Sequence, residues 1–251
     1  MSELKKEERD TFDGGFAVVD RERLIEEETR VVTPWYKHFI NSIIAPSKMM
    51  QENLLHEPPK GNSIAVVGFI LFLILITFMQ HINPEIRQMV YDVLRNKDVA
   101  EDMIGQQYIV TLVVGAISSF VALFAIAFVQ TLVLQILKVI AKDRCKFASL
   151  YTVMLLGLFI SLVVQTADYF AANLIGVNYM VFNLASLFDR TTLMANNTLM
   201  TILSFFSLER IVCMIYLIMG YSMVTHKSKK KATIIVSLLE VIILGFSLIF
   251  A

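Results

Sequence analysis

The residues of this sequence that could do chemistry are a few ionisable and amide side chains set within long apolar stretches. Glu240 is the ninth residue of a terminal stretch that is otherwise apolar or hydroxylic. An acidic side chain at the centre of a membrane span costs roughly 2.5–3.5 kcal/mol, so we expect Glu240 to face protein or water rather than lipid. Either the carboxyl is protonated, or it accepts hydrogen bonds from groups such as Gln130 or Ser161. The candidate binding residues within apolar stretches are Glu240, Asp168, Gln165, Arg210, Glu209 and Gln130.

Two of these residues have opposite charges and should lie at a similar membrane depth. Asp168 is near the end of the third apolar stretch, and Arg210 follows Glu209 at the start of the fourth. Because neighbouring spans run antiparallel, we expect an ion pair between Asp168 and Arg210. Two interpretations of the whole set stay open: the charges fix the register of packed helices, or they line a path for a substrate or a proton.

The sequence offers no pattern typical of a catalytic or metal-binding protein. It contains neither a phosphate-binding Gly-x-x-x-x-Gly-Lys-Ser/Thr loop nor a Gly-x-Ser-x-Gly elbow. Its histidines have no partner at helical spacing, which argues against a zinc site, and they are His38, His56, His81 and His226. We therefore expect no enzymatic activity, no catalytic residue, no metal and no cofactor. Cys145 and Cys213 occupy a basic loop and an apolar stretch, so a disulfide is not expected.

The elements that must position these side chains are transmembrane helices. Hydrophobic residues make up 56% of the sequence, and the mean hydropathy is +0.65. They cluster in runs of about 20 residues, the length that crosses a hydrocarbon core. We predict an all-α, polytopic membrane protein with five spans, at about 64–82, 108–140, 149–174, 205–225 and 232–251. In the second span, the spacing of small residues favours close contact with another helix through Gly115, Ser118, Ala122 and Ala125.

Three regions follow from composition. Residues 1–33 form a charged tail that begins without an apolar signal-peptide region, residues 34–60 form an amphipathic elbow on the membrane surface, and residues 61–251 form the membrane domain. Lysine and arginine gather in the loop after the second span and in the loop after the fourth, which places both loops in the cytoplasm. The N-terminus is then inside and the C-terminus outside. In the long connection between the third and fourth spans we expect a short helix at Tyr179–Phe188.

Three segments resemble the Yip domain family, polytopic membrane proteins first known as partners of Ypt/Rab GTPases and widespread in bacteria. They are Phe-Ile-Asn-Ser-Ile-Ile-Ala-Pro at 39–46, Lys-Val-Ile-Ala-Lys-Asp-Arg-Cys-Lys-Phe at 138–147, and Gly220-Tyr221 followed by a Lys/Ser turn at 227–232. The second segment departs from the family in having Lys-Asp-Arg-Cys where a glycine-containing turn is common. The resemblance covers residues 36–251 and implies a binding role rather than catalysis. Bacterial members can accompany ABC exporters of antimicrobial peptides or envelope components.

The expected function is that of a non-enzymatic partner in the assembly or regulation of other membrane proteins, such as an ABC-type exporter, in a bacterial cytoplasmic membrane. Its expected partners are membrane lipids and other membrane proteins or a second copy of the chain. A nucleic-acid partner is not expected, because the net charge is zero. One alternative is a small secondary transporter or channel-like protein that uses Glu240 and the polar face of the third span. Another is a membrane-shaping, lipid-handling or vesicle-trafficking factor.

Overall fold

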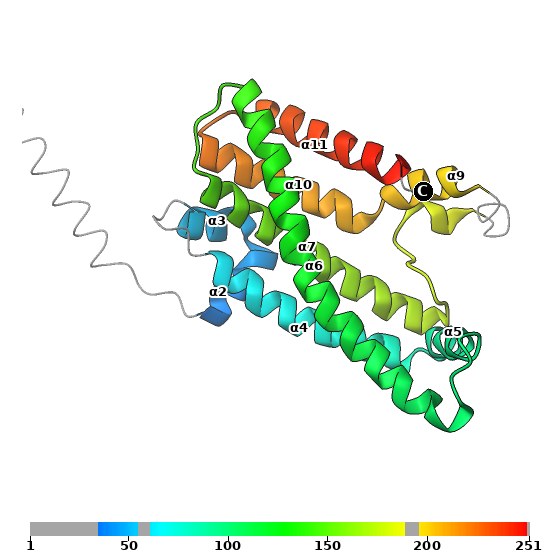
Figure 1. Ribbon diagram of the computed structural model, residues 1–251. Helices are drawn as coiled ribbons and strands as arrows, with labels where there is room; N and C mark the ends of the chain where they lie inside the picture. The colour runs from blue at the N-terminus through cyan, green and yellow to red at the C-terminus, as the bar shows by residue number, and fades with distance from the viewer. Residues whose placement is uncertain (1–34, 55–60, 189–195, 250–251) are drawn as a thin grey trace, which may run out of the picture. The chain divides into compact units, whose positions relative to one another are not determined.

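The computed structural model describes residues 35–54, 61–188 and 196–249, and the predicted tail at 1–33 lies outside the described residues. The chain divides into two units, Met1–Lys37 and His38–Ala251, and the contacts given below lie within the second. The described residues form helices joined by short connections (Figure 1), with one isolated bridge between Asn183 and Ser207. The elements in order are α2 (Trp35–Ile44), α3 (Pro46–Leu54), α4 (Gly61–Ile82), α5 (Pro84–Arg95), η1 (Glu101–Met103), α6 (Ile104–Ile140), α7 (Phe147–Ile175), η2 (Leu184–Leu187), α9 (Asn197–Phe205), α10 (Leu208–Thr225) and α11 (Lys229–Ile249).

Five of these helices are long and apolar enough to cross a membrane, which confirms the predicted all-helical, five-span membrane protein. The spans are Asn62–Ile82, Glu101–Ile140, Phe147–Ile175, Leu208–Thr225 and Lys229–Ile249. The fourth begins three residues later than predicted, because the chain leaves its helical path between α9 and α10. There Ser207 has an extended backbone, and its hydroxyl accepts a hydrogen bond from the amide of Arg210, which caps the start of α10.

The centre of the membrane domain is α7, whose main neighbours are α4 and α10. In its most apolar 18-residue window 56% of residues are buried, against 6% in the corresponding window of α6. Glycines of the flanking helices allow this close approach, since a Cβ at Gly220 would lie 2.5 Å from Val153 and a Cβ at Gly68 would lie 2.3 Å from Phe159. Close packing at small residues, which the sequence suggested for the second span, is therefore found at glycines of the first and fourth spans.

The longest helix, α6, lies across α4, α7 and α11 (Figure 1). Its 37 residues extend about 55 Å, well beyond the thickness of a hydrocarbon core. The predicted packing face is not used within this chain: nothing lies within 4 Å of a Cβ built on Gly115, and Ser118, Ala122 and Ala125 are exposed. The predicted close contact with another helix is therefore not made within this chain, and contact with a helix of another chain stays a prediction.

The helices before the first span pack against the membrane domain through α3, through the ring of Phe39 in α2 and through a hydrogen bond to Ser42. Met49 and Met50 of α3 are completely buried, and α3 contacts α10. From α10, the hydroxyl of Tyr216 donates to the backbone carbonyl of Ser42 in α2. The segment therefore packs as part of the membrane domain from His38 onward.

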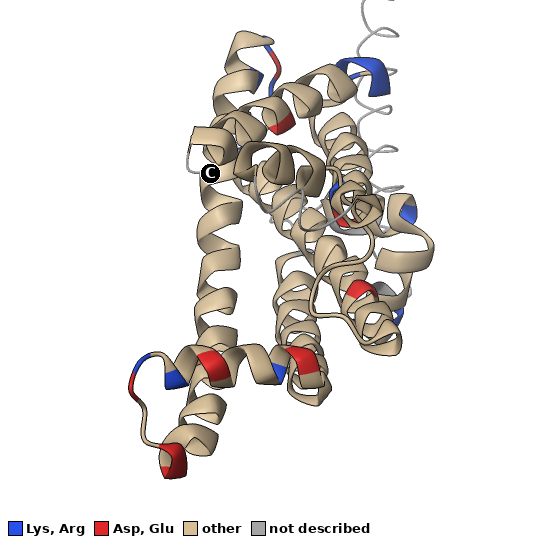
Figure 2. Cartoon of the chain, turned by 90° about the vertical axis from the view of Figure 1, so that its right-hand side faces the viewer, with Lys and Arg blue, Asp and Glu red and all other residues tan. Residues whose placement is uncertain are grey.

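Most charged residues of the spans and their loops lie at the two ends, and the exceptions are Asp168, Glu209, Arg210 and Glu240 (Figure 2). Acidic and basic residues are mixed at one end, on α5, η1 and the turn between them. At the other end, the α6–α7 loop and the start of α11 are mainly basic. This distribution is the one that a membrane domain requires, because charges at the ends of spans remain in contact with water and headgroups.

Candidate functional site

The candidate site contains an ion pair between the last two spans. The guanidinium Nη1 of Arg210 donates to Oε2 of Glu240 at 2.8 Å. The exposed fraction is 32% for the side chain of Arg210 and 13% for that of Glu240. The guanidinium carbon also lies 4.1 Å from the centroid of the Phe205 ring, a favourable cation–π position. Each charged side chain of the pair therefore has a partner inside a mostly apolar region.

The local sequence explains how the two charges meet. Capping by Ser207 fixes the first turn of α10 and with it the position of Arg210. A tight turn after Thr225, with His226 in the left-handed conformation, reverses the chain into α11. Arg210 lies about 22 Å along α10 from this turn, and Glu240 lies about 16 Å along α11, so antiparallel packing brings them to neighbouring depths.

Asp168 is bound in a different way from the prediction. Its Oδ1 accepts hydrogen bonds from the backbone amides of Val181, at 2.6 Å, and Phe182, at 3.2 Å. Asp168 is only 4% exposed, so it carries a buried contact between α7 and the connection to α10. The expected ion pair between Asp168 and Arg210 is wrong: the acid that faces Arg210 is Glu240.

The binding of Asp168 also shapes the connection between α7 and α10. The expected helix at Tyr179–Phe188 is absent from the described residues there, and only the 3₁₀ turn Leu184–Leu187 forms. The amides of Val181 and Phe182 donate to Asp168, while the carbonyl of Phe182 accepts from the amide of Leu208 at 2.8 Å. Because these backbone groups bind the Asp168 side chain and the start of α10, they do not form the hydrogen bonds of the predicted helix.

The remaining predicted residues are half-buried and lie on three different helices. Glu209 is half-buried beside Arg210 in the first turn of α10, and Gln165 is half-buried on α7, three residues before Asp168. Gln130 is also half-buried, and it lines a groove between α6 and α11. It therefore does not take the place of Arg210 as the partner of Glu240.

A second polar cluster, which the sequence interpretation missed, joins the two basic loops. The side chain of Asp143 is completely buried. Its Oδ1 lies 2.5 Å from Nζ of Lys231, and its Oδ2 accepts from the hydroxyl of Tyr221 at 2.9 Å. Lys231 also donates to the carbonyl of Ala141 at 2.8 Å. Asp143 is the only acid in either loop, a signal that could have identified it as their common partner.

The same loop is stabilised from α6. Lys138 is 7% exposed, and its ammonium donates to the carbonyl of Cys145 at 2.9 Å. Burial raises the pKa of the Cys145 thiol, so the thiol is less reactive than an exposed cysteine at neutral pH.

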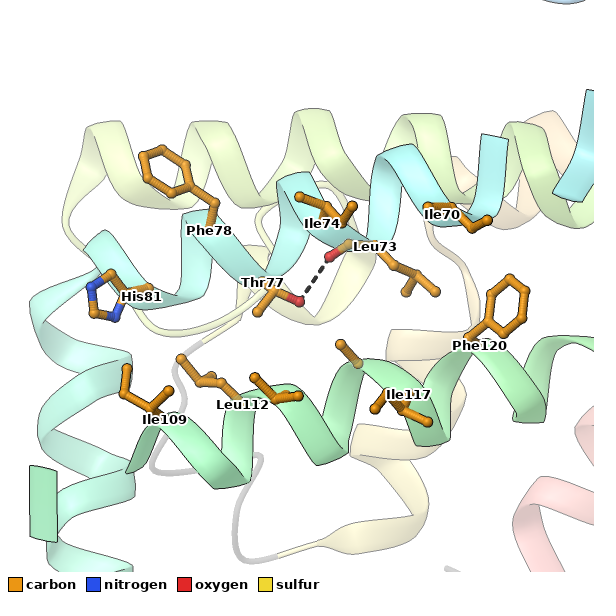
Figure 3. A pocket seen from close by; sticks show the side chains of 12 residues that line it. Ile70, Leu73, Ile74, Thr77, Phe78, His81, Ile109, Leu112, Ile117 and Phe120 are labelled. Atoms are coloured by element: carbon orange, nitrogen blue, oxygen red, sulfur yellow. Dashed lines mark hydrogen bonds between the residues drawn. The ribbon is translucent and has the colours of Figure 1, made fainter. Parts of the chain in front are cut away.

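Two apolar grooves flank α6. The groove against α4 has a volume of about 530 Å³, and Figure 3 shows its side chains converging from both helices. In this groove the hydroxyl of Thr77 donates a hydrogen bond to the carbonyl of Leu73 at 2.8 Å. His81 lies at one end of the groove. The groove against α11 has a volume of about 450 Å³. Both grooves suit apolar groups rather than a polar substrate.

Within the described residues, no three His, Cys, Asp or Glu side chains are grouped so that they could hold a metal ion. Comparisons of the chain with protein-family models, curated proteins and solved structures find no match. The resemblance to the Yip domain family therefore stays a prediction.

Proposed function

We propose that this chain is a non-enzymatic integral membrane protein that assembles with other membrane proteins through α6. The observation that carries the proposal is the low burial of this span: 6% of the residues in its most apolar window are buried, the lowest share of the five spans. The Yip resemblance favours the same role and suggests partners such as the subunits of an ABC-type exporter.

The arrangement of α6 fits a helix-binding surface. Apolar area alone gives no drive for helices to associate in lipid, so association depends on close packing, which small residues allow. The outward face of α6 carries such a row at Gly115, Ser118, Ala122 and Ala125. A helix that faces only lipid has no need of small residues there, whereas a partner helix would use them to approach the α6 backbone.

Photo-crosslinking tests this role directly. A photoreactive amino acid at Gly115 or Ala122 should give a discrete crosslinked product in native membranes, while one at Ile234, an exposed position of α11, should give only lipid adducts. The substitution Ala122→Leu should abolish co-purification with the partner and leave unfolding unchanged, because the side chain points away from the chain's core. A solitary monomer in every mild detergent, with no crosslink from α6, would contradict the proposal.

The proposal includes an orientation. Both basic loops, the N-terminus and the α2–α3 elbow face the cytoplasm of a bacterial cell, the elbow lies along the membrane surface, and the C-terminus is outside. The support is the excess of lysine and arginine at one end of the spans. In a variant without Cys145 and Cys213, a cysteine at Lys97 should react with an impermeant maleimide in intact cells, and one at Lys142 should react only after lysis. The opposite pattern would reverse the orientation.

The transporter alternative depends on Glu240 and the polar groups of α7. The structure gives it less support, because Glu240 is paired with Arg210 and Asp168 is held by two backbone amides. If the alternative holds, Glu240→Gln in reconstituted vesicles abolishes pH-coupled flux while the protein stays folded. Unchanged flux would leave Glu240 a structural residue.

A lipid-handling role would instead place an acyl chain in the groove between α4 and α6.

A further inference from the structure

The α6–α7 loop and the start of α11 lie at the same end of the membrane domain, and both carry basic residues (Figure 2). The α6–α7 loop and the start of α11 are fastened together by Asp143, which binds Lys231 of α11 and Tyr221 of α10. Because this acid is completely buried, its charge is used inside the contact and is not displayed to solvent. We call the outward side chains of these two loops the basic surface, and they are Lys142, Arg144, Lys227, Lys229 and Lys230.

Among the described residues, the charges of the basic surface have no ion pair apart from the long one between Lys227 and Asp143. All five side chains belong to exposed residues, and the two loops contain no acid other than Asp143. Lys227 lies 4.0 Å from Asp143, but that carboxylate already has Lys231 at 2.5 Å. Lys229 and Lys230 also stand in the first turn of α11, where the helix dipole disfavours positive charge. An anion placed against this surface would relieve both effects.

The position of the surface identifies the kind of anion. Next to Lys142 along the chain, α6 ends in Val139 and Ile140, whose exposed fractions are 65% and 72%. Exposed aliphatic side chains of a span lie in the acyl region, so basic and lipid-facing residues adjoin within one turn of helix. A molecule that meets both carries an anionic group next to hydrocarbon chains, as an anionic phospholipid does.

We propose that the basic surface binds the headgroups of anionic phospholipids and so retains them around this end of the protein. Arg144, Lys229 and Lys230 bind the phosphates, and Val139 and Ile140 contact the acyl chains. Asp143 does not touch the lipid: it positions the α6–α7 loop against α11 so that the charges converge. This binding uses the ends of α6 and α11, whereas the proposed partner surface is the middle of α6, so either can fail without the other.

Native mass spectrometry of the full-length chain, released from micelles with equimolar phosphatidylglycerol and phosphatidylcholine, tests the proposal. The wild type should retain phosphatidylglycerol in strong preference to phosphatidylcholine. A surface lysine or arginine contributes about fivefold to the binding of anionic lipid, so replacing Arg144, Lys229 and Lys230 together with glutamine should reduce the preference by about 100-fold. Raised salt should weaken it in the wild type.

A matched control removes three basic residues from the opposite end of the spans, as Arg87→Gln, Arg95→Gln and Lys97→Gln. This variant should keep the preference of the wild type, and circular dichroism should show that both variants are folded. Equal retention of the two lipids by the wild type would overturn the proposal, as would an unchanged preference in the first variant. Inorganic phosphate that displaces phosphatidylglycerol at equal concentration would also overturn it, because the acyl contacts would then contribute nothing.

Discussion

Replacing Arg210 with methionine removes the cation that faces Glu240 and leaves a carboxylate that is 13% exposed among apolar helices. Exposed ion pairs contribute about 0.2–1 kcal/mol, whereas breaking a fully buried pair costs about 3–5 kcal/mol. Because Arg210 itself is 32% exposed, the pair lies between these limits. We expect Arg210→Met to lower the free energy of unfolding by about 2.5 kcal/mol.

Replacing the acid of the pair should lower the free energy of unfolding by a smaller amount. Glu240→Met leaves Arg210 over the ring of Phe205 and within reach of water, so we expect a loss of about 1 kcal/mol. With both charges removed no unpaired ion remains, and replacing a whole buried pair by apolar side chains is often neutral, so the double variant should lie within about 1 kcal/mol of the wild type. The expected coupling energy is then about 2.5 kcal/mol.

Equilibrium unfolding in mixed micelles of mild detergent and sodium dodecyl sulfate, followed by circular dichroism, gives the three free-energy differences. A double variant as unstable as the two single changes combined would mean a coupling energy near zero. The geometric pair would then contribute nothing to stability, and the structural interpretation of Glu240 would be refuted.

Three further predictions concern packing, the buried acid and the loop thiol. Gly220→Ala should lower the free energy of unfolding by about 2 kcal/mol, because its Cβ would lie 2.5 Å from a side chain of α7. Gly115→Ala should change it by less than about 1 kcal/mol, because nothing lies within 4 Å of a Cβ there. Equilibrium unfolding of both variants checks this. Asp143→Asn should cost about 2 kcal/mol in the same assay, because the lysine bound to it loses its charged partner. At neutral pH the half-buried Cys145 should alkylate more slowly than a cysteine introduced at Arg144, and its rate should approach the control as pH rises through the raised pKa of its thiol. Equal rates at neutral pH would contradict the argument that partial burial slows the reaction.

The number of helices long and apolar enough to cross a membrane could be predicted from the sequence, because crossing requires about 20 apolar residues whatever the neighbouring helices are. Which helices form the centre could not. The most buried span, α7, and the most exposed span, α6, have similar mean hydropathies of 2.3 and 2.6. Since both lipid and protein interior accept apolar side chains, hydrophobicity does not distinguish a face that packs from one that meets lipid.

The candidate site was predictable in its members but not in its pairing. Glu240 and Arg210 are conspicuous because charge is costly in a span, yet depth alone led to the pairing of Arg210 with Asp168 and left Glu240 without a cation. The pairing is determined by the connection between α7 and α10, which turns its backbone amides toward Asp168. Asp143 was missed because a charge in a loop is ordinarily solvated, and its burial depends on the approach of α10 and α11.

Three acids show how the helices are held together, and they leave α6 apart. Asp168 ties α7 to the start of α10, Glu240 ties α11 to α10, and Asp143 ties the loop before α7 to both. Along α6 itself, the hydroxyls of Thr111 and Thr131 donate to carbonyls of the same helix. The polar connection of α6 to other parts is instead at its end, from Lys138 to the following loop. A partner helix that binds the middle of α6 would therefore displace lipid without breaking any of these polar contacts, which makes α6 the span best suited to an intermolecular role.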